Sequence, residues 1–423
     1  MTNSAAKPSV TFREAFHFWL KLGFISFGGP AGQIAIMQKE LVENRRWIEQ
    51  DDFLHALNFC MLLPGPEAQQ LATYMGWRLH GIRGGIVAGA FFVLPSVFLL
   101  LILSYIYAVY GNLPQIDAVL DGFKAVVVAI VIEAVIKIGK KSFKSIRHIL
   151  IAALAFAAIY FFQIPFPLIV VCAAAAGFIA LQSPTDKIAA PRIFSNENSK
   201  NISRFQPFKV FVVSLCLWLA PFIVLTSLLG YENLLTQIYI FFSQAAFVTF
   251  GGAYAVLAYV NQAVVSSGWL TAAQTVDGLA LAETTPGPLI MVLQFIGFMT
   301  GWNNPMLANQ TASAIVSAML ATYATFLPSF FFIFIGAPHI DKLRGNQKVS
   351  GALSGVMAAV VGVILNLAIM FGAAVIFQNE RANFFAIGMS ILAFIGLYFL
   401  KLDVLIVIAL GGLFGLAKYF VFG

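Results

Sequence analysis

The chain has 423 residues, of which 60% are hydrophobic and only 10% are charged. Soluble globular domains carry roughly 25% charged residues, so this composition excludes a soluble protein and indicates a polytopic membrane protein. The net charge of +7 sits in short loops between apolar segments. It therefore indicates membrane orientation rather than a surface for nucleic acid.

The first ten residues are polar and lead directly into an amphipathic segment. They show no separate hydrophobic region and no small-residue cleavage site, which a cleavable signal peptide would have. We therefore expect the N-terminus to stay on the cytoplasmic side.

The two halves of the chain repeat the same landmarks in the same order. Two pairs lie 222 or 223 positions apart and a third pair lies 233 apart. The pairs are Phe27-Gly28-Gly29 with Phe250-Gly251-Gly252, Pro64-Gly65-Pro66 with Pro286-Gly287-Pro288, and Leu94-Pro95-Ser96 with Leu327-Pro328-Ser329. Ordered matches of this kind indicate an internal duplication.

In each half, the sequence predicts two segments of about 30 residues that are broken by Gly or Pro. Two full-length apolar spans and then two short apolar helices follow. In the first repeat, residues 11–182, these are 11–41, 51–80, 85–109, 118–136, 149–161 and 165–182. In the second repeat, residues 230–420, they are 233–262, 271–300, 313–335, 350–371, 383–399 and 403–420. A polar cytoplasmic linker, 183–208, and one unpaired transmembrane helix, 209–229, lie between the repeats.

The unpaired helix crosses the membrane once, so it should invert the second repeat, and the loop charges agree. The loops that carry Lys or Arg are 78–84, 137–148 and 336–349, whereas 110–117, 263–275 and 301–312 carry none. Because cationic loops stay in the cytoplasm, the C-terminus is expected outside. The predicted fold is an all-α polytopic membrane protein with two inverted repeats of six segments each, as in many secondary transporters.

The first two segments of each repeat are either through-going helices or re-entrant hairpins. Each arm of 11 to 16 residues is short for a membrane span. Lys39, Arg45 and Arg46 would all be cytoplasmic if the first two segments were hairpins. The sequence favours hairpins.

The breaks in these segments predict an anion-binding site. Within a membrane, irregular backbone is tolerated only where protein buries it or where it lines a cavity. A helix that restarts after a break offers unpaired backbone N–H groups and a positive dipole end, and glycine permits close approach. The alternative is a proline kink or a tight helix crossing through small residues. The candidate substrate-binding residues at the breaks are Phe27, Gly28, Gly29, Pro30, Pro64, Gly65, Pro66, Gly251, Gly252, Pro286, Gly287 and Pro288.

Polar side chains near the breaks add further candidates. Lys21 shares one helix face with Arg13 and His17, and this cationic stripe leads towards Gly28, although basic groups near a helix end also snorkel without any function. Gln33 and Gln70 are neutral candidate ligands for a tetrahedral oxyanion.

Three carboxylates are candidates for proton coupling. Glu67 follows Pro66 directly, where it either stabilises a helix N-terminus or couples proton and anion movement by being protonated when the anion is bound. Glu133 lies with Lys124 in an otherwise apolar span, where ionisable groups suggest function, although an ion pair with another helix is an equal alternative. Glu283 precedes the second Pro-Gly-Pro.

The sequence lacks the constellations that an enzyme would need. The three cysteines form no CxxC pattern, the five histidines form no HExxH, and no P-loop is present. We therefore expect no metal, no cofactor and no direct use of ATP.

The phrases FWLKLGFISFGGPAGQIAIMQKELV and LPGPEAQQLATYMGW, with AFVTFGGAYAVL and TPGPL in the second half, resemble the chromate ion transporter family in its two-domain form. The resemblance extends over nearly the whole chain outside 183–208. It implies export of chromate, an analogue of sulfate, across the bacterial cytoplasmic membrane, driven by the electrochemical gradient. The matching motif residues are Phe27, Gly28, Gly29, Pro30, Pro64, Gly65, Pro66, Glu67 and Gln70.

Three functions stay open on these grounds. Chromate efflux that confers chromate resistance comes first, a carrier of sulfate or another tetrahedral oxyanion second, and an anion channel on the same scaffold third. The expected partners are the oxyanion and membrane lipid, with a homodimer possible and no nucleic acid.

Overall fold

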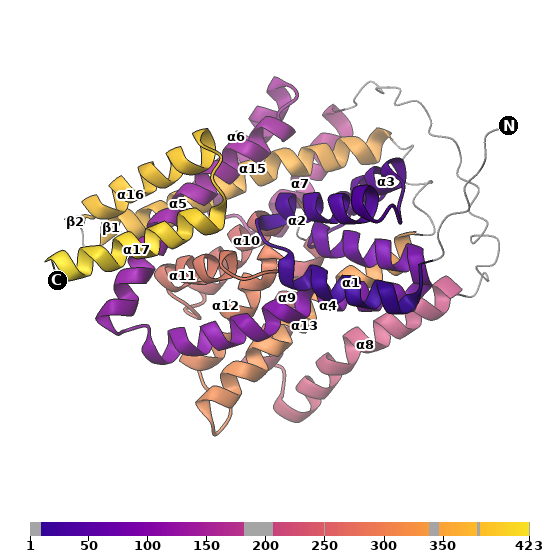
Figure 1. Ribbon diagram of the computed structural model, residues 1–423, viewed down its shortest axis with the longest axis horizontal. Coiled ribbons are helices and arrows are strands. Elements are labelled where there is room, and N and C mark those ends of the chain that lie inside the picture. Colours follow the sequence, from indigo (N-terminus) through magenta and orange to yellow (C-terminus); the bar gives the residue numbers. More distant parts are fainter. Residues whose placement is uncertain (1–9, 182–205, 249, 338–346, 379–380, 423) are drawn as a thin grey trace.

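The computed structural model describes residues 10–181, 206–248, 250–337, 347–378 and 381–422. In these ranges the regular elements are helices except for the two-residue strands β1 (Phe377–Gln378) and β2 (Arg381–Ala382), which pair antiparallel. Most of the predicted linker 183–208 lies outside the described residues. Five of the described helices are long and apolar enough to span a membrane, consistent with a polytopic membrane protein (Figure 1).

The described helices follow the predicted segments closely. The first half contains α1 (Phe12–Ile25), α2 (Gly29–Gln38), the π-helix η1 (Lys39–Asn44), α3 (Gln50–Cys60), α4 (Glu67–Tyr110), α5 (Pro114–Ser142), α6 (Ile146–Phe162) and α7 (Phe166–Ala180). The helix α8 (Gln206–Leu229) follows. The second half contains α9 (Leu234–Val248), α10 (Ala253–Ser266), α11 (Ala272–Glu283), the 3₁₀-helix η3 (Leu289–Met291), α12 (Val292–Asn303), α13 (Gln310–Gly336), α15 (Gln347–Ile376), α16 (Phe384–Phe394), the π-helix η5 (Ile395–Phe399) and α17 (Val404–Phe422).

The π-helix η1 explains why the repeat offset falls from 223 to 222. A π-turn holds one residue more than an α-turn, and the first half has one more residue between Phe27 and Trp47 than the second has between Phe250 and Trp269. The counterpart of η1 belongs to α10, which is α-helical throughout. The extra residue is thus absorbed within a helix and leaves its flanks in register.

The helix α4 consists of two antiparallel arms rather than one straight rod. His80 and Gly81 have non-helical backbone angles, and a Cβ at Gly76 would lie 2.3 Å from the carbonyl oxygen of Gly84. Residues eight positions apart meet in this way only when the chain reverses between them. The predicted boundary between the segments 51–80 and 85–109 is therefore a tight turn at His80–Gly81.

Each of the broken segments also reverses direction at its break. The rings of Phe18 and Trp47 lie 5.2 Å apart across the first break, and those of Phe241 and Trp269 lie 5.6 Å apart across the third. The second hairpin is closed by an ion pair of 3.0 Å between Arg78 and Asp52.

In the fourth hairpin, the side-chain amide of Asn303 donates to the side-chain oxygen of Gln274 at 3.3 Å. Because contacts near the ends of each segment bring its two arms together, all four broken segments are helical hairpins.

The long helices of the two halves exchange partners. The first half's α6 and α7 pack on α15 of the second half, and the second half's α16 and α17 pack on α5 of the first. Figure 1 shows α16 and α17 beside α5 at one end of the molecule. Most of the buried apolar side chains form one core that both halves share, so the halves form a single packed body.

Candidate functional site

The motif glycines at the four breaks adopt backbone angles that few other residues tolerate. Their φ values are positive: 86° and 66° at Gly28 and Gly29, 117° at Gly65, 89° and 88° at Gly251 and Gly252, and 95° at Gly287. An L-residue in this region costs roughly 1–2 kcal/mol. The glycines are therefore required by the turns that end one helix and start the next.

The first and fourth breaks contact each other across the two halves. The backbone N–H of Gly287 donates to the carbonyl of Ser26 at 2.7 Å. The side-chain amide of Gln33 donates in return to the carbonyl of Gly287. These bonds satisfy polar backbone groups that would otherwise be unpaired in an apolar interior.

The second and third breaks form the corresponding pair. A Cβ at Gly252 would lie 3.9 Å from the carboxylate of Glu67, the residue that follows Pro66. The helix η3, which follows the fourth break, contacts both α10 and α4, which follow the third and second. The four breaks thus meet between the halves, with each break of one half paired to a break of the other.

Two serines that the sequence analysis treated only as repeat landmarks lie against these breaks. The hydroxyl of Ser96 on α4 donates to the carbonyl of Pro286. The hydroxyl of Ser329 on α13 lies 2.9 Å from the place of a Cβ at Gly65. Both side chains are buried. The Leu-Pro-Ser motif of each half thus packs on the Pro-Gly-Pro break of the other, which its recurrence alone could have suggested.

The buried glutamines present their amides differently from the expected anion ligands. The amide of Gln70 donates to the carbonyl of Pro64 at 2.7 Å, as that of Gln33 donates to Gly287. Within the described part of the chain, the side-chain oxygens of both residues are buried and accept no hydrogen bond. The side-chain amide nitrogens of both glutamines therefore stabilise the turns, and their unpaired oxygens lie beside the same breaks.

The cationic stripe lies apart from these buried turns. Arg13, His17 and Lys21 are all exposed on α1, whose buried face consists of other residues. His17 donates from its ring to the carbonyl of Arg13. Lys21 therefore lies on the exposed face of α1, outside the hydrogen bonds that join the breaks.

The three candidate coupling carboxylates occupy different surroundings. Glu283, at the end of α11, is buried and accepts a hydrogen bond of 3.0 Å from the hydroxyl of Tyr254. Glu133 on α5 interacts electrostatically with Glu283 and forms a 2.7 Å ion pair with Lys137. Glu67 is half-buried at the second break.

Lys124 belongs to a separate charged cluster between α5 and α11. Its ammonium group lies 3.7 Å from a carboxylate oxygen of Asp277 and 3.3 Å from one of Asp121. The hydroxyl of Tyr107 on α4 donates to the other oxygen of Asp277 at 2.9 Å. The ion pair with another helix, one of the two sequence-based alternatives, is thus present for Lys124, whereas Glu133 pairs within its own helix.

The comparison with known proteins agrees with the motifs. A family model described as "Chromate transporter" matches residues 13–178 and 236–416. The chain is 31% identical to the chromate transport protein of Pseudomonas aeruginosa over 425 aligned residues, covering 98% of this chain and 94% of the relative. It is 29% identical to the chromate transport protein of Cupriavidus metallidurans over 413 residues, covering 97% and 94%.

A more distant relative is an uncharacterized transporter of Methanocaldococcus jannaschii, 25% identical over 400 residues, with coverage of 94% and 92%. No solved structure matches the chain. The matched family consists of membrane transporters rather than enzymes. Because the family model covers both halves around the paired breaks, the chain belongs to the chromate transporter family.

Proposed function

We propose that the protein is a secondary active transporter of a tetrahedral oxyanion, and that it exports chromate across the bacterial cytoplasmic membrane and so confers resistance to chromate. The observation that carries the proposal is the crosswise pairing of the four breaks between the two halves. The names of the relatives in Pseudomonas aeruginosa and Cupriavidus metallidurans support chromate as the anion.

The paired breaks suit an anion for a physical reason. Helices α2, α4 and α10 begin at breaks, so their first N–H groups and dipole ends point towards the region where the breaks meet. A dianion there would accept hydrogen bonds from backbone N–H groups that the helices hold in place. These N–H groups come from both halves of the chain. Alternating access then requires that one bundle of helices rocks against another around this region.

The buried carboxylates support coupling to protons. An unpaired charge in a membrane interior costs several kcal/mol, so Glu67 beside a bound dianion is most stable in its protonated form. Release of the anion would let Glu67 ionise. Glu133 and Glu283 are the other candidates for the coupling residue, since the two carboxyl groups interact electrostatically. The loaded carrier would then move the anion and a proton in the same direction. Because the dianion with one proton keeps a net negative charge, a membrane potential that is negative inside favours its export.

The proposed orientation has the N-terminus in the cytoplasm and the C-terminus outside, with the second repeat inverted. The recurrence of the whole element order after α8 supports this arrangement, because a single crossing between two six-segment repeats reverses the second.

Purified protein in liposomes tests the proposal. Chromate and sulfate fluxes are measured with and without an imposed pH gradient. The proposed carrier saturates with chromate, prefers it to sulfate and accelerates when the gradient is imposed. Preference for sulfate would support the second sequence-based candidate, and a non-saturating flux that ignores the gradient would support a channel.

A further inference from the structure

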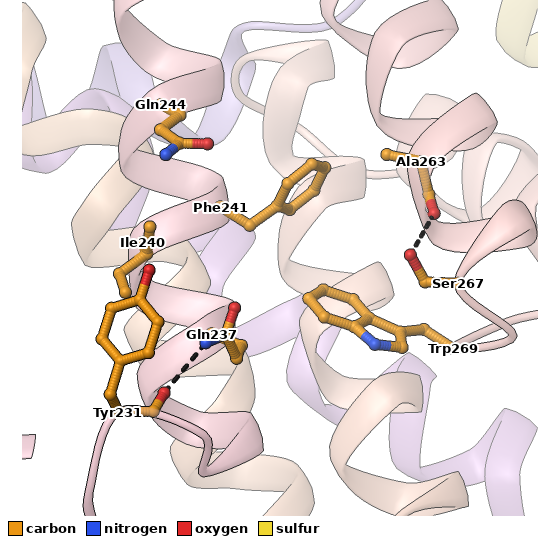
Figure 2. A pocket seen from close by; sticks show the side chains of 8 residues that line it. All are labelled: Tyr231, Gln237, Ile240, Phe241, Gln244, Ala263, Ser267 and Trp269. Carbon is orange, nitrogen blue, oxygen red and sulfur yellow. Dashed lines mark hydrogen bonds between the residues drawn. The ribbon is translucent and has the colours of Figure 1, made fainter. Parts of the chain in front are cut away.

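A cavity lies between the arms of the third hairpin, away from the paired breaks. It has a volume of about 230 Å³ and is lined by residues of α9, of α10 and of the loops at their outer ends. Figure 2 shows its lining: Tyr231, Gln237, Ile240, Phe241, Gln244, Ala263, Ser267 and Trp269. None of these side chains carries a charge.

In the first hairpin, the side chain of Arg45 occupies the space that corresponds to this cavity. There the guanidinium of Arg45 lies 4.9 Å from the ring centres of both Phe18 and Trp47. Its nitrogen also lies 3.5 Å from a carboxylate oxygen of Glu40. An ion-paired arginine thus closes the space between the arms.

The second repeat retains the aromatic pair but lacks the arginine. Phe241 and Trp269 correspond to Phe18 and Trp47, and both ring pairs are edge-to-face. Ser267 stands where Arg45 stands, two residues before the tryptophan in each case. Backbone bonds from each tryptophan N–H, to Leu41 and to Val264, fix this register.

The acidic partner of the arginine is missing from the second repeat as well. Glu40 and Ala263 directly precede the two residues that accept these backbone bonds, so Ala263 occupies the place of Glu40. The hydroxyl of Ser267 donates to the carbonyl of Ala263 at 2.8 Å instead. Loss of both charged side chains therefore accounts for the cavity.

The cationic stripe of α1 is also absent from this hairpin. At the offset of 223, Gln244 replaces Lys21 and Ile240 replaces His17. The donors left in the cavity are neutral: the amide of Gln244, the indole N–H of Trp269 and the hydroxyl of Tyr231. The amide of Gln237 is committed to the carbonyl of Tyr231 at 2.9 Å.

We propose that this cavity is an outer binding site, through which the transported tetrahedral oxyanion passes between the third break and the exterior; the inference rests on the proposed function and its orientation. Its neutral donors can replace part of the hydration shell of an oxyanion. Hydrogen bonds from charged donors are roughly twice as strong as neutral ones, so the anion is held less tightly here than beside Lys21. The cationic stripe at the inner end and the neutral site at the outer end favour export.

Replacing Ser267 by arginine, the residue at the equivalent position of the first repeat, tests the site. Ser267→Arg should place a guanidinium over Phe241 and Trp269, as Arg45 lies over their counterparts, and most of the chromate export rate should be lost. Ser266→Arg is the matched control, because it adds the same charge at the neighbouring exposed residue, which does not line the cavity, and it should export at the wild-type rate. Export by Ser267→Arg at the wild-type rate, at equal membrane content, would overturn the site but leave the proposed function intact.

A chemical plug applied after folding removes the risk that the arginine variant misfolds. Ser267→Cys is made in a chain whose three natural cysteines are replaced by alanine, and whole cells are treated with a membrane-impermeant methanethiosulfonate. Labelling from outside with loss of export is expected. Absence of labelling from outside, or labelled protein that exports normally, would refute the outer site, whereas failure of the unlabelled wild type to move chromate would refute the proposed function instead.

Discussion

At the scale of single residues, the glycines of the breaks combine a backbone requirement with a steric one. Gly65 has a φ of 117°, and a Cβ there would lie 2.9 Å from both the Gln70 amide and the Ser329 hydroxyl. Gly230 also has a positive φ, but no atom lies within 4 Å of its Cβ position. The two positions therefore separate backbone strain from crowding at the breaks.

Gly65→Ala is predicted to abolish chromate transport in liposomes while the protein still inserts into the membrane. Gly230→Ala carries the same left-handed strain of roughly 1–2 kcal/mol and should transport nearly normally. Retained chromate transport in Gly65→Ala, at unchanged protein level, would count decisively against the breaks as the site.

Glu67 is the residue that we propose couples the anion to protons. Glu67→Gln mimics the protonated carboxyl, so it should retain anion exchange but lose the acceleration of net transport by a pH gradient. Glu67→Asp should retain both in weakened form. Flux measured across a series of imposed gradients distinguishes these outcomes, and an unchanged gradient response in Glu67→Gln would shift the coupling role to Glu133 or Glu283.

Ser96 and Ser329 occupy equivalent places with unequal bonding. Removing the Ser96 hydroxyl leaves the buried carbonyl of Pro286 without this donor, and an unsatisfied buried group costs about 1–3 kcal/mol. Ser96→Ala should therefore lower the unfolding temperature in detergent. Ser329→Ala is the matched control, because the carbonyl of Pro64 already accepts from Gln70, and equal losses in the two variants would contradict this assignment.

At the scale of elements, the turn at His80–Gly81 depends on small residues that bring the arms of α4 together. A Cβ at Gly84 would lie 2.2 Å from the carbonyl oxygen of Gly76, so the arms would have to separate. Gly372 lies within α15 with no atom within 4 Å of its Cβ position. The two glycines thus have opposite consequences in helical segments.

Gly84→Ala is predicted to destabilise the protein by about 1–3 kcal/mol, the usual cost of overpacking. Gly372→Ala should stabilise it by roughly 0.5–1 kcal/mol, since alanine favours a helix interior. Thermal unfolding in one detergent compares the two, and similar shifts of the same sign would show that helix propensity, not contact between the arms, sets the effect.

At the scale of the whole molecule, the proposed inverted topology makes specific predictions about loops. Reporters fused after Gly81, Lys144 and Lys342 should report cytoplasm, and those after Asn112 and Asn303 should report the outside. A cytoplasmic reporter at Asn303 would remove the inversion, and with it the outer location of the α9–α10 cavity.

The sequence by itself determined the membrane class, the duplicated order of segments and the family, because these depend on composition and on local patterns. Apolar runs of sufficient length must be buried in lipid or protein whatever their partners. The glycines and prolines of the repeated Phe-Gly-Gly and Pro-Gly-Pro motifs likewise indicated the four breaks, and the positive φ at each break glycine confirms this prediction.

Only the tertiary structure decided which breaks meet and which side chains close them. The bond from Ser96 to Pro286 joins residues 190 positions apart, and that from Gln33 to Gly287 joins residues 254 apart. Such pairings depend on how whole helices exchange partners between halves, which no local pattern encodes. The open cavity at Ser267 arises in the same way, since the missing arginine is visible in the sequence but the space it leaves depends on the surrounding helices.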